Sequence, residues 1–181
     1  MSAILPPTSP SASAENATRV GLVAALSAAS MLFASLVSAY LVRRSFPDWR
    51  PSPALWPFGL LFFAMAASAG IEVASRSIDA RRRAAMWLVA IGSALYLFCA
   101  IGALAVLCEA EGGLNPPHRA FVVLLLGVHV VHALLGVIFS IWTLRPASHL
   151  RGDEGIELSR LAIHFLTALL AAIIGLLFIV Q

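Results

Sequence analysis

Five long apolar runs constrain the fold of this chain more than any other feature of its sequence. They cover residues 20–42, 54–74, 84–108, 120–144 and 161–180. A helix of about 20 residues rises about 30 Å, which is the thickness of the hydrocarbon core of a bilayer. Only 12% of the residues are charged, whereas about a quarter are charged in a water-soluble domain. The sequence therefore predicts an all-α integral membrane protein, a bundle of five transmembrane helices within residues 19–181.

Residues 1–18 have a different composition and are rich in Pro, Ser and Ala. Such segments bury too little apolar surface to fold on their own, so we expect a disordered N-terminal tail.

The arginines predict the orientation of the helices, because the cytoplasmic loops of membrane proteins carry the excess of basic residues. A cytoplasmic N-terminus places eight of them on the cytoplasmic side: Arg19, Arg76, Arg81, Arg82, Arg83, Arg145, Arg151 and Arg160. The other four lie outside: Arg43, Arg44, Arg50 and Arg119. We therefore expect a cytoplasmic N-terminus and a periplasmic C-terminus, and we interpret the arginines as topology signals rather than as a nucleic-acid surface.

Small and polar residues recur on one face of three of the expected helices. The stripes are Ser27, Ser30, Ala34 and Ser38; His129, His132, Gly136 and Ser140; and His164, Thr167, Ala171 and Gly175. In lipid, helices associate through small residues that allow close approach and through polar side chains that bond across the contact. The stripes therefore predict the helix–helix contacts, with the histidines inside the bundle. Tyr40 and Trp142 lie near the ends of runs, as is typical of residues at the membrane interface.

The histidines could in principle bind a metal. A b-type haem needs one histidine from each of two helices at the same depth. We expect His129 about ten residues from the outer end of its helix and His164 only about four from the inner end of the last one, so the depths match poorly. Zinc or copper needs further ligands that the neighbouring sequence lacks. We therefore expect seam hydrogen bonds and no metal, cofactor-binding or catalytic residue in this chain.

Glu72 is the only acid inside an expected span, four residues before Arg76. An ion pair between these two residues is the simplest interpretation. An acid within the membrane is also a candidate for function, and a proton relay between Glu72 and the histidines is the open alternative.

The fourth run carries a specific motif. Gly127, His129, His132 and Gly136 lie in the stretch GVHVVHALLG, which resembles the signature G-[FV]-H-x-x-H-[VA]-x-x-G of subunit III of haem–copper oxidases. The last run contains His164 and Phe165, as the last helix of that family does. The stretches MLFA (31–34) and SAGIEVA (68–74) are similar to segments of its earlier helices. The chain departs from the family at Ala29 and Thr167, where relatives carry acids, so the roles of those acids are not expected here.

This resemblance implies a divergent five-helix member of the family. It implies a non-catalytic, multi-pass subunit in a bacterial inner membrane, bound to oxidase subunits I and II and to phospholipid. The haem and copper lie in those partner subunits, and the complex reduces oxygen in aerobic respiration while translocating protons. Structural roles at helix contacts are implied for His129, His132, Gly136, His164, Phe165 and Glu72. The alternatives are a related small subunit of a nitric oxide reductase, a di-histidine haem b anchor of a quinone-linked dehydrogenase, and a small transporter.

Overall fold

The computed structural model describes residues 10–49, 56–77, 79–109, 117–143 and 154–179. Over these residues the chain forms five helices, α1 (Pro10–Arg44), α2 (Trp56–Ser75), α3 (Asp79–Glu109), α4 (Pro117–Thr143) and α5 (Glu154–Ile179). Each contains a stretch that is long and apolar enough to cross a membrane. The predicted all-helical fold with five helices long and apolar enough to span a membrane is confirmed, and it suggests a multi-pass membrane protein.

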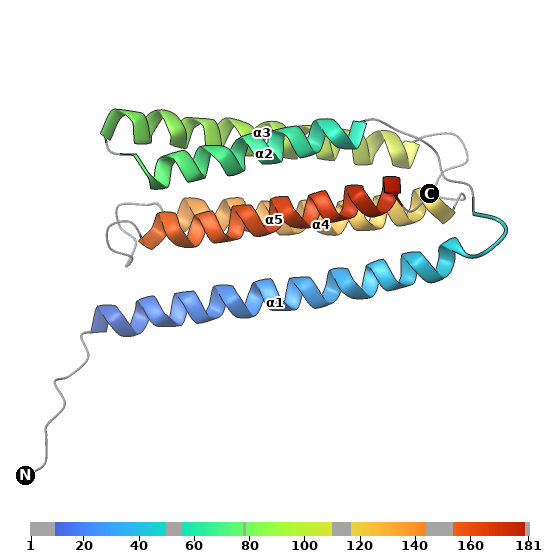
Figure 1. The fold of residues 1–181 in the computed structure, drawn as a ribbon, viewed down its shortest axis with the longest axis horizontal. Helices are drawn as coiled ribbons and strands as arrows, with labels where there is room; N and C mark the ends of the chain where they lie inside the picture. The colour runs from blue at the N-terminus through green and yellow to red at the C-terminus, as the bar shows by residue number, and fades with distance from the viewer. Residues whose placement is uncertain (1–9, 50–55, 78, 110–116, 144–153, 180–181) are drawn as a thin grey trace, which may run out of the picture.

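The helices lie in three layers, and each runs antiparallel to the next one in the chain (Figure 1). α2 and α3 form one outer layer, α4 and α5 form the middle layer, and α1 lies on the other side. Among the described residues, α1 packs only on α4 and α5, whereas α5 also packs on α2 and α4 also packs on α3. The middle layer therefore connects the whole bundle.

α1 and α5 begin well before the apolar runs that predict them, and α3 and α4 begin a few residues before theirs. α1 begins at Pro10 and so includes residues 10–18, which corrects the expected tail; residues 1–9 lie outside the described part. Proline suits a first turn because its nitrogen needs no hydrogen-bond partner there, and the alanines that follow favour a helix. α5 begins at Glu154 rather than at 161, since Glu154 and Glu157 in its first turn interact favourably with the helix dipole.

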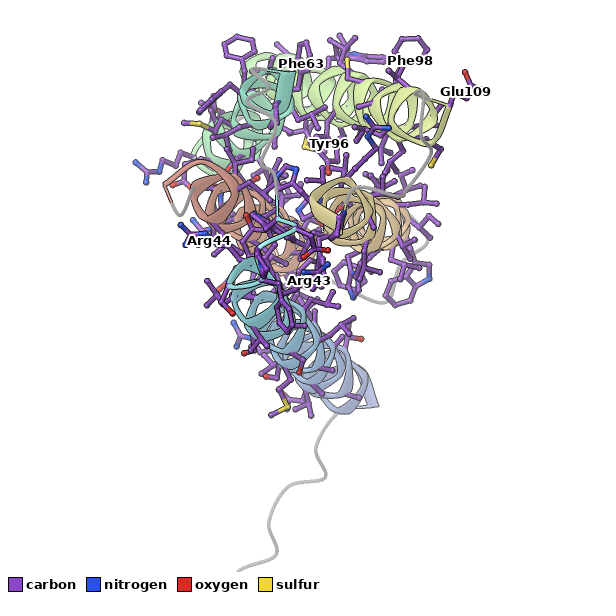
Figure 2. All side chains as sticks on the ribbon, turned by 90° about the vertical axis from the view of Figure 1, so that its right-hand side faces the viewer. Arg43, Arg44, Phe63, Tyr96, Phe98 and Glu109 are labelled. Carbon is purple, nitrogen blue, oxygen red and sulfur yellow. The ribbon has the colours of Figure 1, made fainter. Side chains whose placement is uncertain are left out.

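Each of the two contacts between neighbouring layers contains a large buried cluster. Between the α2–α3 layer and the middle layer lie Leu60, Ala64, Tyr96, Ala100, Leu126, Ala133, Leu170 and Ile174. Between α1 and the middle layer lie Phe33, Tyr40, Val122, Leu125, Ile173 and Leu177. Figure 2 shows Tyr96 pointing into the bundle and Phe98 pointing away from it. Phe98 is 78% exposed, as expected for a side chain that faces lipid rather than water.

The stripe of small residues on α1 does not form the contact that we expected. Ser27, Ser30, Ala34 and Ser38 are all exposed, and the buried face carries Leu22, Ala29, Phe33 and Tyr40 instead. The Ser30 and Ser38 hydroxyls donate to carbonyls of their own helix, those of Leu26 and Ala34. They therefore need no partner across a seam, and bulky side chains fill the contact between α1 and the middle layer.

Glycine brings two helix pairs close together. A Cβ atom added at Gly92 of α3 would lie 3.0 Å from the backbone nitrogen of Ala67 in α2. At Gly136 of α4, the added Cβ would lie 2.6 Å from Cδ1 of Leu166 in α5, the flexible end of a side chain. Backbone cannot yield as a side chain can, so Gly92 is the stricter requirement. Gly136 belonged to a predicted stripe, whereas Gly92 did not.

We predict that Gly92→Leu lowers the free energy of unfolding by about 1–3 kcal/mol, because the new side chain must displace α2. Gly102→Leu is the matched control on the same helix, since nothing lies within 4 Å of a Cβ atom there. Its effect is expected to be neutral or stabilising, because leucine favours a helix more than glycine does. Unfolding of the purified protein by SDS in mixed micelles measures both changes. Equal losses for the two variants would contradict the close approach of α2 and α3.

Candidate functional site

His129 lies at the centre of the bundle and is 1% exposed. Its Nε2 lies 2.9 Å from the carbonyl oxygen of Leu166 in α5, and its Nδ1 contacts the hydroxyl of Tyr96 in α3. A carbonyl can only accept, so Nε2 carries the proton and donates it, and Nδ1 accepts from the Tyr96 hydroxyl. One imidazole therefore joins α3, α4 and α5, and both of its nitrogens are engaged.

His164 forms a second polar cluster, between α5 and α2. Its Nε2 lies 3.2 Å from Oε2 of Glu72, and its Nδ1 contacts the hydroxyl of Ser68. An ionised carboxylate only accepts, so Nε2 donates to Glu72 and Nδ1 accepts from Ser68. Ser68 and Glu72 are four residues apart, so they lie on one face of α2 and hold the ring between them.

Glu72 also receives two guanidinium groups. It forms an ion pair with Arg76, as the sequence predicts, and Nη1 of Arg160 in α5 lies 3.6 Å from its Oε2. This cluster lies at the end of the bundle where α2 ends and α5 begins, hereafter the Glu72 end. The Glu72 and His164 side chains are 29% and 40% exposed. They are therefore within reach of groups from outside the bundle.

A bay of about 250 Å³ opens beside this cluster. It is lined by Arg19, Glu72, Glu157, Leu158, Arg160, Leu161 and His164. Arg19 of α1 pairs with Glu157 of α5 at 3.2 Å across the bay. Charged groups from three helices thus surround the bay.

His132 lies one turn after His129 on α4, beside α1, and bonds within its own helix. Its Nδ1 lies 2.8 Å from the carbonyl oxygen of Val128, to which it donates. Its ring meets the Phe33 ring edge to face at 5.6 Å. With Gly136 and Phe165 it lines a cleft of about 290 Å³ between α1 and the middle layer. Within the described part of the chain, His132 therefore lies at a helix contact without a hydrogen bond across it.

His164 lies near the Glu72 end and its side chain is 40% exposed, whereas His129 is buried at the centre of the bundle. Along α5, His129 bonds the carbonyl oxygen of Leu166, two residues after His164. The two rings also differ in direction, since His129 faces Tyr96 and His164 faces α2. No group of three or more His, Cys, Asp or Glu side chains that could hold a metal ion occurs among the described residues.

Two residues of these clusters were not predicted as partners of the histidines: Ser68 and Tyr96. Tyr96 carries a usable signal, since a tyrosine deep in an apolar run must place its hydroxyl against a partner. Thr167 stands where relatives carry an aspartate, but it belongs to a stripe that was predicted to form helix contacts. Its hydroxyl donates to the carbonyl of Ala64 in α2 at 3.3 Å, so it does bond a neighbouring helix.

An aromatic cluster closes the opposite end of the bundle, hereafter the Tyr40 end. Tyr40 is fully buried rather than exposed at an interface as expected. Its ring and that of His118 pack edge to face on Trp49, at 5.2 and 5.3 Å. The Tyr40 hydroxyl has no hydrogen-bond partner in the described part of the chain. Arg43 donates to Asp48 at 2.7 Å, and these hydrogen bonds lower the pKa of Asp48 below its ordinary value.

Comparisons of the chain with protein-family models, with curated proteins and with solved structures find no significant match.

The two tyrosines of the chain give opposite predictions. Tyr96→Phe leaves Nδ1 of the buried His129 without a donor, so we expect the free energy of unfolding to fall by about 1–3 kcal/mol. Tyr40→Phe removes a buried hydroxyl that has no partner, so we expect no loss or a small gain. SDS unfolding of the two variants measures the difference. A larger loss for Tyr40→Phe would contradict the hydrogen bond to His129.

The two carboxylates that line the bay, Glu72 and Glu157, are expected to contribute differently to the free energy of unfolding. Glu72→Gln removes the charge that Arg76, Arg160 and His164 share, whereas Glu157→Gln removes a single pair whose side chains are 60% and 55% exposed. An exposed pair contributes at most about 1 kcal/mol. We therefore expect Glu72→Gln to lower the unfolding free energy more than Glu157→Gln does. The reverse order would show that the Glu72 cluster does not hold α2 on α5.

Proposed function

We propose that this chain is a non-catalytic subunit of a bacterial haem–copper terminal oxidase, similar to subunit III. The supporting observation is the pattern Gly127, His129, His132, Gly136 in the penultimate helix, followed by His164 and Phe165 in the last helix. The order of the five helices fits the same family. In this proposal the chain lies in the inner membrane with the Glu72 end in the cytoplasm.

The geometry of the motif supports a structural rather than a redox role. His129 uses both ring nitrogens on protein groups of α3 and α5, and Gly136 lets α4 and α5 approach. Residues used in this way hold a bundle together. In this proposal the haem and copper belong to the partner subunits I and II, which reduce oxygen to water and translocate protons, while this chain stabilises subunit I.

The outward face of α1 suits a partner helix. Ser27, Ser30, Ala34 and Ser38 give this face a row of small side chains beside exposed larger ones such as Val23 and Met31, and the Ser30 and Ser38 hydroxyls are satisfied within α1. Small residues allow a second helix to approach closely in lipid. The cleft between α1 and the middle layer, whose lining is mostly apolar, suits the acyl chain of a phospholipid, as the resemblance implies.

The test is affinity purification of the tagged chain from its native membrane in mild detergent. We expect a larger, haem-containing subunit to copurify with oxygen-consuming activity, and the separated chain to show no Soret band. Ala34→Leu is expected to reduce retention of the partner, while Gly102→Leu, on the exposed face of α3, is expected to leave it unchanged.

Other outcomes would favour the alternatives. A complex that reduces nitric oxide instead of oxygen would indicate the related reductase. A b-type Soret band in the isolated chain that disappears in His132→Ala would indicate a haem anchor and would overturn the proposal.

A further inference from the structure

The bay at the Glu72 end gives water access to a protonatable pair inside the membrane-spanning region. It has a volume of about 250 Å³ and is lined by both Glu72 and His164. The other charged groups that face the pair are Arg19 of α1, Arg76 of α2, and Glu157 and Arg160 of α5. A carboxylate and an imidazole in contact can pass a proton from one to the other, since the carboxylate accepts a proton and the imidazole both accepts and releases one.

His164 extends this route into the bundle. Its Nε2 faces Glu72 and its Nδ1 faces Ser68, on the far side of the ring. An imidazole can accept a proton at one nitrogen and release one at the other. Thr167 lies one helical turn further along α5 and donates to the carbonyl of Ala64, which lies one turn further along α2. One turn is about 5 Å, a separation that a single water spans between two hydroxyls.

A second cavity continues the route between α2, α3, α4 and α5. Its volume is about 40 Å³, and its lining includes three hydroxyl side chains, those of Thr167, Ser93 and Tyr96. A volume of about 10–15 Å³ suffices for one water, provided that polar partners are present. The three hydroxyls supply these partners, and Tyr96 in turn donates to Nδ1 of His129.

His129 is the end of this series of polar groups. Its Nε2 is held by the carbonyl of Leu166, and the Phe33 ring packs edge to face on the imidazole at 6.2 Å. The other histidines on its own helix are His132, one turn away, whose Nδ1 bonds Val128, and His118 at the start of α4. Towards the Tyr40 end, the buried cluster that contains Leu125 and Val122 is apolar.

We propose that these groups form a one-sided proton path, which connects the bay at the Glu72 end with His129 at the centre of the bundle. This path is independent of the function proposed above. Glu72 binds a proton as the carboxylic acid and then donates to Nε2 of His164, so the ring carries its own proton on Nδ1 instead of Nε2. Transfer of the Glu72 proton to Nε2 releases the Nδ1 proton to Ser68, and this restores the tautomer that donates to ionised Glu72. Ser68 passes its own hydroxyl proton on through water to Thr167 and the second cavity.

At the far end, Tyr96 takes a proton from the cavity water and gives its hydroxyl proton to Nδ1 of His129. His129 becomes an imidazolium ion, and Glu72 is again ionised. One proton has moved, no electron has moved, and the transfer is reversible.

The experiment measures exchange of the Tyr96 hydroxyl proton with solvent in the full chain in micelles. Tyrosine labelled with ¹³C at Cζ reports hydroxyl deuteration through an isotope shift, and the chain has only two tyrosines. Tyr40, buried at the other end and off the path, is the internal reference. We expect the Tyr96 hydroxyl to exchange faster than the backbone amides of α3, and Thr167→Val to slow it by about tenfold or more.

Ser68→Ala tests the path at an earlier step and is expected to slow Tyr96 exchange in the same way. Ser38→Ala, which removes a hydroxyl on the exposed face of α1, is the matched control and is expected to change nothing. Unchanged amide exchange in α3 shows that a variant is folded. If either Thr167→Val or Ser68→Ala does not fold, the other variant provides the test. The proposal is overturned if Tyr96 exchanges no faster than the amides, or if its rate in the folded path variants equals that of the wild-type chain.

Discussion

The structure depends on one requirement, that the histidines His129 and His164 inside an apolar bundle find hydrogen-bond partners in the protein. His129 meets it by bonding Tyr96 of α3 and the carbonyl of Leu166 in α5. His164 meets it by bonding Ser68 and Glu72 of α2. Leucine side chains have no such preference, because lipid is as apolar as a neighbouring helix. The two imidazoles therefore specify which faces of α2, α3, α4 and α5 meet, and apolar packing fills the remaining contact.

The contacts of α1 are of a different kind. It packs on α4 and α5 through bulky side chains such as Phe33 and Tyr40, and a cleft of about 290 Å³ remains beside His132 and Phe165. Its single described ion pair to another helix, Arg19 with Glu157, is exposed. The four helices that are linked by the hydrogen bonds of His129 and His164 thus form one unit. α1 is held on this unit mainly by the packing of its apolar and aromatic side chains.

The sequence predicts the number of helices because each apolar run matches the thickness of a bilayer. It places Glu72 beside Arg76 because residues four apart share a helix face. It does not predict that Glu72 meets His164, since this contact depends on how α2 and α5 are rotated against each other. It misses the beginning of α5 because residues 154–160 carry several charged and polar side chains. The serine stripe of α1 was wrongly predicted to form a contact within the bundle, because serine hydroxyls can form their hydrogen bonds within their own helix.

The central position of His129 has an electrical consequence. A full membrane potential of 100 mV changes the energy of one elementary charge by about 2.3 kcal/mol between the two sides. A proton that reaches His129 from the Glu72 end has crossed part of this voltage drop without leaving the bundle. Occupancy of that imidazole by a proton would therefore respond to the polarisation of the membrane as well as to the acidity on one side, so that an energised and a de-energised membrane would hold different charge states of the same chain.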